Sequence, residues 1–465
     1  MGRSGEATPR RRMARRLGGL VVLAALVGTP MSAPRGEEAL AGAITRFATD
    51  AAGLVDRTGV TAYTTESLGW GPKGEPDMRL ALRRPKAFTD CSGWVAYLLA
   101  VVSPLHEAVL ARHRLAAVFN EGVLDEAAFP WPRAFVVRDY LARQPVEGSA
   151  AVGGFRQIAD FRRLAPGDVV AWCLGVWCRP RTMTREPDGA TGHVFVVVGH
   201  PKPISPTVRD YLGVVDGVAT LGKVPGRRVT GVVELSVVDS SSDPHFHDTR
   251  DFERVPPAAP AESIPGGLGS GRIWIAHDAT GAPVQFRFSR AAPYLPNPAR
   301  PGTVEFGAGR PLPAMNLRGE LVVTRYGNVV DELAGQRYTT APVRLEGRGA
   351  LEIRAGAPLA LAAPSSFRGT IRIGLGAALS AASDAALGEA GNPVHLLGRL
   401  TLADGFAGAA DRRLIAEPSG VLATAGDATW REPLSGRSLT VDAAGRLTLS
   451  ALGRTVHGRR TLRLP

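Results

Sequence analysis

A short glycine-led pattern recurs through the last third of this 465-residue chain. In each copy a glycine is followed by aliphatic residues at alternate positions, which is the pattern of a short strand with one buried face. The copies begin at Gly319, Gly349, Gly369, Gly398 and Gly445. Repetition at roughly 20–30 residues, with one longer gap, is typical of coils stacked on one another. We therefore expect a parallel β-helix within residues 304–465, with a β-sandwich as the alternative all-β fold.

The length and the charge limit the class of the whole protein. A chain of 465 residues exceeds one ordinary domain. We expect an N-terminal domain at residues 40–292, a proline-rich linker at 293–303 and the repeat domain after it. The formal net charge is +12, but residues 1–33 alone hold six arginines and one glutamate. No later basic run would follow a phosphate backbone, so we expect no nucleic-acid partner.

The first 33 residues have the features of a secretory signal peptide. Arginines within residues 10–16 precede an apolar stretch at 17–27, and small residues follow it. The stretch is too short to span a bilayer comfortably, although a retained signal anchor is the alternative. We expect the mature chain to be secreted or periplasmic in a bacterial cell envelope, with no stable membrane insertion after cleavage.

The chain has three cysteines, which are Cys91, Cys173 and Cys178. Outside the cytoplasm thiols tend to pair, and Cys173 and Cys178 are near enough in sequence for a local disulfide. Such a pair leaves Cys91 as a single thiol, which in a secreted chain is a candidate reactive group.

The surroundings of Cys91 predict that it begins a helix. The spacing of Val95, Leu98 and Leu99 is that of a buried helix, and Asp90 is a good N-cap residue. At this position the positive end of the helix dipole and the free backbone N–H groups favour a thiolate. The same N–H groups can hold a developing oxyanion.

Two further strands carry groups that acyl transfer requires. Residues 192–199 are predicted to form a strand with His193 at its start, and residues 232–239 a strand that ends in polar side chains. A thiol, an imidazole and a polar orienting group in this order suit nucleophilic catalysis. His200 lies after the first of these strands and is a rival for the base. A hairpin at residues 271–288 and a helix at 135–141 are also predicted.

Three motifs resemble those of the NlpC-type cell-wall cysteine peptidases. They are Asp-Cys-Ser-Gly at residues 90–93, Leu-Ala-Pro-Gly-Asp at 164–168 and the strand at 192–199. The resemblance implies an α+β papain-like N-terminal domain, peptidoglycan stem peptides as the substrate and no cofactor. It places the nucleophile at Cys91 and the base at His193. The third position falls on Asp239, whereas the family usually has His, Asn or Gln there, and His245 is the alternative.

The resemblance also implies substrate-binding residues. Tyr63 is the candidate for a family tyrosine near the oxyanion, although the usual Gly-Gly after it is missing. Asp90 and Ser92 match positions that bind a free amine of the substrate in some relatives. His245 and Asp248 lie in a polar segment without a second well-spaced ligand pair, so we expect no metal there.

Residues 386–398 resemble the passenger repeats of autotransporters, but no alternating barrel segments follow them. We expect a binding, spacer or surface-display role for this half.

The leading hypothesis is thus an exported cysteine hydrolase that cleaves peptidoglycan amide bonds. One alternative is a non-catalytic wall-binding or adhesive protein with a degenerate peptidase domain. Another is an amidase or acyltransferase on the same scaffold. The sequence does not indicate an oligomeric state.

Overall fold

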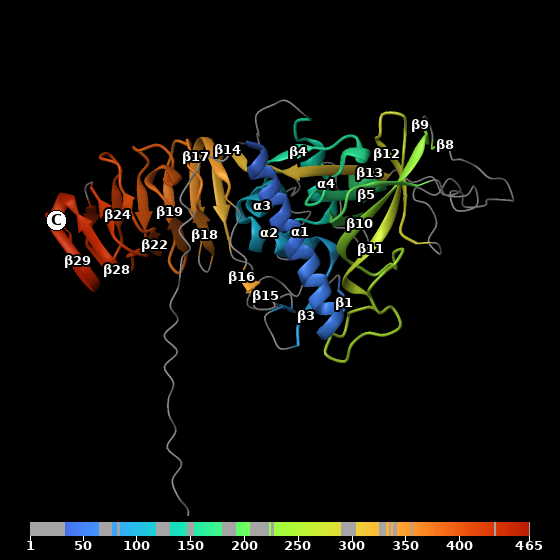
Figure 1. Cartoon of the computed structure of the whole chain (residues 1–465), viewed down its shortest axis with the longest axis horizontal. Coiled ribbons are helices and arrows are strands. Elements are labelled where there is room, and N and C mark those ends of the chain that lie inside the picture. Colours follow the sequence, from blue (N-terminus) through green and yellow to red (C-terminus); the bar gives the residue numbers. More distant parts are fainter. Residues whose placement is uncertain are drawn as a thin grey trace, which may run out of the picture. The chain divides into compact units, whose positions relative to one another are not determined.

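The alternating aliphatic residues of the C-terminal part form two stacks of parallel strands in this computed structural model (Figure 1). One sheet has the strand order β14-β17-β19-β21-β24-β27, and the other runs β18-β20-β22-β25-β28-β26-β23. Together they form a β-solenoid of about five turns. The predicted parallel β-helix is confirmed, and the β-sandwich alternative is wrong.

The structure describes residues 33–64, 77–80, 84–117, 131–146, 153–178, 192–204, 223–224, 227–289, 304–324, 332–333, 336–337, 342–354, 357–431 and 434–464. The predicted linker at 293–303, and all but the last residue of the predicted signal peptide at 1–33, lie outside these residues.

The first solenoid sheet consists of β14 (Ala314–Val323), β17 (Arg344–Ile353), β19 (Ile371–Ile373), β21 (Val394–Leu396), β24 (Leu414–Ala416) and β27 (Leu434–Gly436). The second consists of β18 (Pro358–Leu361), β20 (Ala378–Ala381), β22 (Arg399–Leu402), β25 (Val421–Thr424), β28 (Ser438–Leu449), β26 (Ala428–Trp430) and β23 (Phe406–Ala407). The last strand, β29 (Arg454–Arg463), is antiparallel to β28.

Inward-facing aliphatic residues stack from one coil to the next. Val394 pairs with Leu414, and Leu414 pairs with Leu434, at intervals of 20 residues. All three side chains are buried, because alternate residues of a strand point to the same face. Four of the five recurring glycines, all except Gly319, have a steric cause. A methyl group at Gly369 would lie 1.6 Å from the backbone oxygen of Gly349 on the preceding coil.

The N-terminal part is built on an antiparallel sheet of eight strands. Its order is β12-β11-β10-β6-β5-β13-β4, with β7 beside β10. The strands are β4 (Phe155–Gln157), β5 (Val169–Leu174), β6 (Gly192–Val197), β7 (Lys202–Ile204), β10 (Gly231–Ser241), β11 (Gly267–His277), β12 (Pro283–Arg287) and β13 (Val304–Pro311). The pairing of β11 with β12 confirms the predicted hairpin.

The strand β13 belongs to this sheet, because it pairs with β5 and with β4. The solenoid therefore begins at β14, one strand later than the boundary at residue 304 that the sequence indicated.

Four helices lie among the described residues: α1 (Ala33–Thr58), α2 (Cys91–Val102), α3 (Pro104–Ala117) and α4 (Ala134–Ala142). The last confirms the helix predicted at 135–141. Trp94 and Val95 of α2 share a hydrophobic cluster with Val194 and Val196 of β6, so α2 packs on one face of the sheet. Phe195 stands between these two valines and points to the opposite face of the sheet, where it belongs to a second hydrophobic cluster. No helix in the described ranges is long and apolar enough to cross a membrane.

A small sheet precedes α2, in which β3 (Lys86–Thr89) lies between β1 (Val60–Tyr63) and β2 (Asp77–Arg79). Two short antiparallel pairs complete the strands: β8 (Lys223–Val224) with β9 (Arg227–Arg228), and β15 (Glu332–Leu333) with β16 (Gln336–Arg337).

Candidate active site

Cys91 is the first residue of α2, as the sequence predicts. The carboxylate of Asp90 caps the helix and accepts a hydrogen bond from the backbone N–H of Gly93 at 2.6 Å. Extended backbone at Asp90 ends β3 and turns the chain into the helix. The thiol therefore lies in the first turn, at the positive end of the helix dipole.

Tyr63 reaches the thiol because β1 and β3 are parallel and in register. Tyr63 pairs with Thr89, two residues before Cys91. Its phenol forms a side-chain hydrogen bond with Cys91. The loss of solvent around the hydroxyl raises the pKa of Tyr63 well above its ordinary value, and the charges of Cys91 and Asp90 add to this effect. Tyr63 therefore keeps its proton and is a hydrogen-bond donor beside the sulfur.

His193 is the second residue of β6 and forms side-chain hydrogen bonds with both Cys91 and Asp239. Its Nε2 lies 2.5 Å from Oδ2 of Asp239. Burial lowers the pKa of His193, but the electrostatic attraction of Cys91 and the hydrogen bond to Asp239 outweigh this effect and raise the pKa to about 10. His193 is an imidazolium at neutral pH.

Asp239 is fully buried near the end of β10 and accepts three hydrogen bonds. His193 and His245 both donate from Nε2 to Oδ2, at 2.5 and 2.8 Å, and Arg250 donates from Nη2 to Oδ1 at 2.5 Å. Burial raises the pKa of Asp239, but the charge of Arg250, then that of His245, and the two histidine bonds lower it well below the ordinary value. The carboxylate is ionised.

Both sequence-based candidates for the third position, Asp239 and His245, lie in this network. Asp239 lies against His193, and His245 is a second donor to the same carboxylate rather than a substitute for it. His200 is exposed and follows the end of β6 by three residues.

Asp90 and Ser92, the predicted amine-binding pair, are both buried and are bonded to each other. The hydroxyl of Ser92 donates to Asp90 at 3.0 Å and accepts a hydrogen bond from Trp131 Nε1 at 3.0 Å. Arg133 lies 4.0 Å from the second carboxylate oxygen of Asp90. In this structure the pair stabilises the start of α2.

The reacting atoms have little contact with solvent. Cys91 is 4% exposed and His193 is 6% exposed. The ring of His193 packs edge-on against Phe288, with 5.4 Å between centroids, and lies 6.0 Å from the ring of Trp172.

The three cysteines form one disulfide and leave one free thiol, as the sequence suggested. Cys173 and Cys178 form a disulfide at the end of β5, and Cys91 is free. Cys173 pairs with Gly192, the residue before His193, so the disulfide lies at the end of an interior strand next to the site.

The Pro-Gly-Asp motif has a structural role. Asp168 is fully buried, accepts a bidentate pair of hydrogen bonds from Arg310 at 2.8 and 3.0 Å, and accepts one from the N–H of Ala165. Gly167 has a positive φ of 91°, and a methyl group there would lie 2.7 Å from Cα of Ala41. The motif therefore builds the turn on which α1 rests.

One group among the described residues has a donor set that suits a metal. His193, Asp239 and His245 each place a ligand atom within 4.8 Å of the others. Each imidazole donates a proton to an ionised carboxylate here, whereas a metal ligand needs a deprotonated nitrogen. The Arg250 cation also lies 2.5 Å from Asp239. The arrangement fits a polar network better than a cation.

Arg250 is the site residue that sequence reasoning missed. The signal for it is a pair of glycines, Gly269 and Gly271, on the strand that pairs with β10. Asp239 is directly opposite Gly269. Neither glycine lies in a turn, so each indicates a side chain that crosses the strand closely.

Comparison of the chain with protein-family models, with curated proteins and with solved structures gives no match.

Proposed function

We propose that this protein is an exported cysteine hydrolase that cleaves amide bonds in the stem peptides of peptidoglycan. The observation that carries the proposal is the hydrogen-bonded series from Cys91 through His193 to Asp239. Nucleophile, base and orienting group require a thiol, an imidazole and a carboxylate in this order. An antiparallel sheet with the thiol-bearing helix packed on it is also what the papain-like resemblance leads us to expect.

The reaction begins from a thiolate and an imidazolium. The sulfur of Cys91 attacks the carbonyl carbon of the amide, and the carbonyl oxygen becomes an oxyanion that the Tyr63 hydroxyl stabilises. His193 then gives its proton to the leaving amine, and the C–N bond breaks to leave a thioester on Cys91. Water loses a proton to His193 and attacks the thioester, which releases the carboxylic acid and restores the sulfur–imidazolium pair.

Export is supported by the leader sequence together with the disulfide between Cys173 and Cys178. Disulfides persist in oxidising compartments such as the bacterial periplasm and the cell exterior. The peptidoglycan substrate is found in the same compartments.

The test is the release of free amino groups from purified peptidoglycan. We expect the wild-type protein to release them and Cys91→Ala to release none while keeping the wild-type unfolding midpoint. His193→Ala should behave like Cys91→Ala. The control is His200→Ala, because His200 is an exposed histidine after the same strand, and it should retain activity. Equal release by Cys91→Ala would reject the proposal.

The small exposure of Cys91 and His193 favours a second candidate, a non-catalytic wall-binding protein. In that case the sulfur–imidazole pair is a buried structural interaction. Sedimentation with insoluble peptidoglycan separates the two functions. If the wild-type protein binds the wall and releases no amines, the result supports the second candidate. Amine release that depends on Cys91 supports the first.

A further inference from the structure

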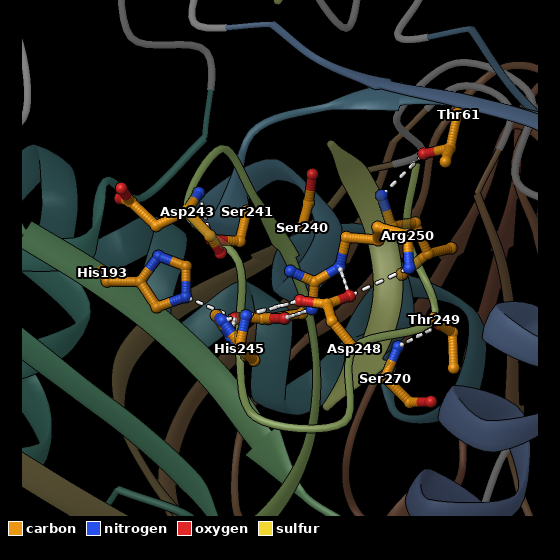
Figure 2. Close-up of polar contacts among 12 residues, drawn as sticks. Thr61, His193, Ser240, Ser241, Asp243, His245, Asp248, Thr249, Arg250 and Ser270 are labelled. Carbon is orange, nitrogen blue, oxygen red and sulfur yellow. Dashed lines mark hydrogen bonds and ion pairs between the residues drawn. The ribbon is translucent and has the colours of Figure 1, made fainter. Parts of the chain in front are cut away.

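The segment that follows β10 brings two buried donors back to Asp239. His245 and Arg250 both have side chains with no exposed surface. They bind opposite oxygens of the carboxylate, with His245 on Oδ2 and Arg250 on Oδ1. Figure 2 shows His193 and His245 close together, with Asp248 and Arg250 beyond them. The carboxylate is therefore held on both oxygens in addition to its bond with His193.

Asp248 gives this segment its shape. Its Oδ2 accepts the backbone N–H of His245 at 2.7 Å, and its Oδ1 accepts the backbone N–H of Arg250 at 2.9 Å. The ring of His245 also stacks on Phe288, with centroids 4.8 Å apart and an interplanar angle of 4°. These contacts hold the backbone at both donors and the ring of His245. Each donor therefore reaches Asp239 in a defined orientation.

Two glycines on β11 give the donors room. A methyl group at Gly271 would lie 2.6 Å from Cβ of His245, and one at Gly269 would lie 2.4 Å from Cγ of Arg250. Both distances are shorter than non-bonded carbon atoms allow. Side chains at these positions would displace the donors from the carboxylate.

We propose that His245 and Arg250 are positioning residues that fix the carboxylate of Asp239, so that its Oδ2 faces Nε2 of His193 and the ring stays beside Cys91. This inference rests on the proposed function for its catalytic meaning. The two residues touch neither the sulfur nor the substrate, and they act through Asp239.

The physical reason is rotation of the carboxylate. An Asp carboxylate turns about its last torsion with a broad energy minimum, so one hydrogen bond to an imidazole does not define its plane. Donors on both oxygens define it. The charged and titratable side chains around this network are Cys91 on α2, Tyr63 on β1, His193 on β6 and Asp248 in the same segment, besides the two donors.

The experiment measures the rate constant of Cys91 with iodoacetamide at pH 6, which reports the reactivity of the sulfur beside His193. Cys91 is the free thiol of the chain, so the label is specific. We expect His245→Phe, which keeps an aromatic ring on Phe288 but loses the donor, to slow the reaction by about tenfold. His245→Gln keeps an N–H donor and should restore the rate to within about twofold of wild type. A wild-type rate in His245→Phe would overturn the proposal.

A matched control lies two residues away. His247 is exposed and has a positive φ of 52°, which Asn tolerates, so His247→Asn should leave the rate unchanged. Equal slowing by His247→Asn and His245→Phe would show a general effect of the segment and overturn the proposal.

A second variant covers the case in which His245→Phe does not fold. Gly271→Ala leaves every donor in place but crowds His245, and it should slow alkylation as His245→Phe would; an unchanged rate counts against the proposal. The alkylation rate does not depend on the substrate. A failure of peptidoglycan cleavage would therefore reject the proposed function without affecting this comparison.

Discussion

Ser240 donates a hydrogen bond from Oγ to the backbone oxygen of Thr89 at 2.6 Å. Both residues are buried. Ser240 follows Asp239 on β10, and Thr89 lies two residues before Cys91 at the end of β3. This one bond therefore joins the strand that carries the carboxylate to the segment that carries the thiol, across 151 positions of the chain.

Replacing Ser240 should destabilise the protein. Ser240→Ala leaves the buried oxygen of Thr89 without this donor, which costs about 1–3 kcal/mol. Urea unfolding gives the free energy. The control is Ser419→Ala, whose exposed hydroxyl donates to Leu397 at 2.8 Å, and whose loss should be smaller because water replaces the bond. Equal losses in the two variants would contradict this account of the bond.

The ion pair at His193 should stabilise the fold in a defined pH range. The pKa of His193 is about 10 in the folded protein against an ordinary 6.5, so the folded state binds the imidazole proton more tightly than the unfolded state does. The stabilisation is fully present below pH 6.5 and is lost as the pH rises through 10. We expect the free energy of unfolding of the wild type to exceed that of His193→Gln most at pH 6 and least above pH 10. A difference that is constant with pH would contradict the ion pair.

His106 should give the opposite pH dependence, because its contribution to the stability of the fold is lost in acid rather than in base. Burial is the main cause that lowers its pKa to about 4, while its ring bonds Ser103 Oγ at 2.7 Å and the backbone oxygen of Gly154 at 2.8 Å. A buried neutral histidine stabilises the fold above pH 6.5, and this contribution is lost as the pH falls towards 4. Unfolding measured from pH 7.5 to 4.5 should be less pH-dependent in His106→Gln than in the wild type. An identical pH dependence would count against the neutral ring.

A buried arginine should be essential to the solenoid. The guanidinium of Arg412 binds both carboxylate oxygens of Asp384, at 2.6 and 3.0 Å, and backbone oxygens nearby. These backbone oxygens belong to Asp384, Leu387, Gly388 and Asn392.

Removing Arg412 leaves these acceptors without a donor. Arg412→Met should cost about 3–5 kcal/mol of stability, because it breaks a buried ion pair. Arg399 pairs with Asp442 at 2.7 Å on the surface, so the control Arg399→Met should cost less than about 1 kcal/mol. Guanidinium unfolding compares them, and a small loss at Arg412 would contradict its structural role.

The solenoid could be predicted from the sequence because its stabilising contacts repeat. The glycine and the alternating aliphatic residues stand at similar intervals, so the pattern is visible without any long-range pairing. Its copies nevertheless fall in two sheets: Gly349 begins the copy in β17, and Gly398 precedes the copy in β22. Periodicity alone does not tell which wall of a coil a strand forms.

The site could be predicted only as far as local motifs extend. The N-cap Asp90 and the spacing after Cys91 place the thiol on a helix, and His193 starts a strand of β-branched residues. The contribution of Arg250 depends on a return of the chain to Asp239, and β13 joins β5 across about 130 positions. Such non-local pairings leave little local signal beyond the glycines that make room for them.

The measurement that tests the central claim most directly is the pH dependence of Cys91 alkylation from pH 5 to pH 10, in the wild type and in His193→Gln. A sulfur that is paired with an imidazolium reacts as a thiolate in mildly acidic solution. The account predicts a wild-type rate constant at pH 6 at least about tenfold above that of His193→Gln. Superimposable profiles that both rise near the ordinary thiol pKa of about 8.5 would contradict it.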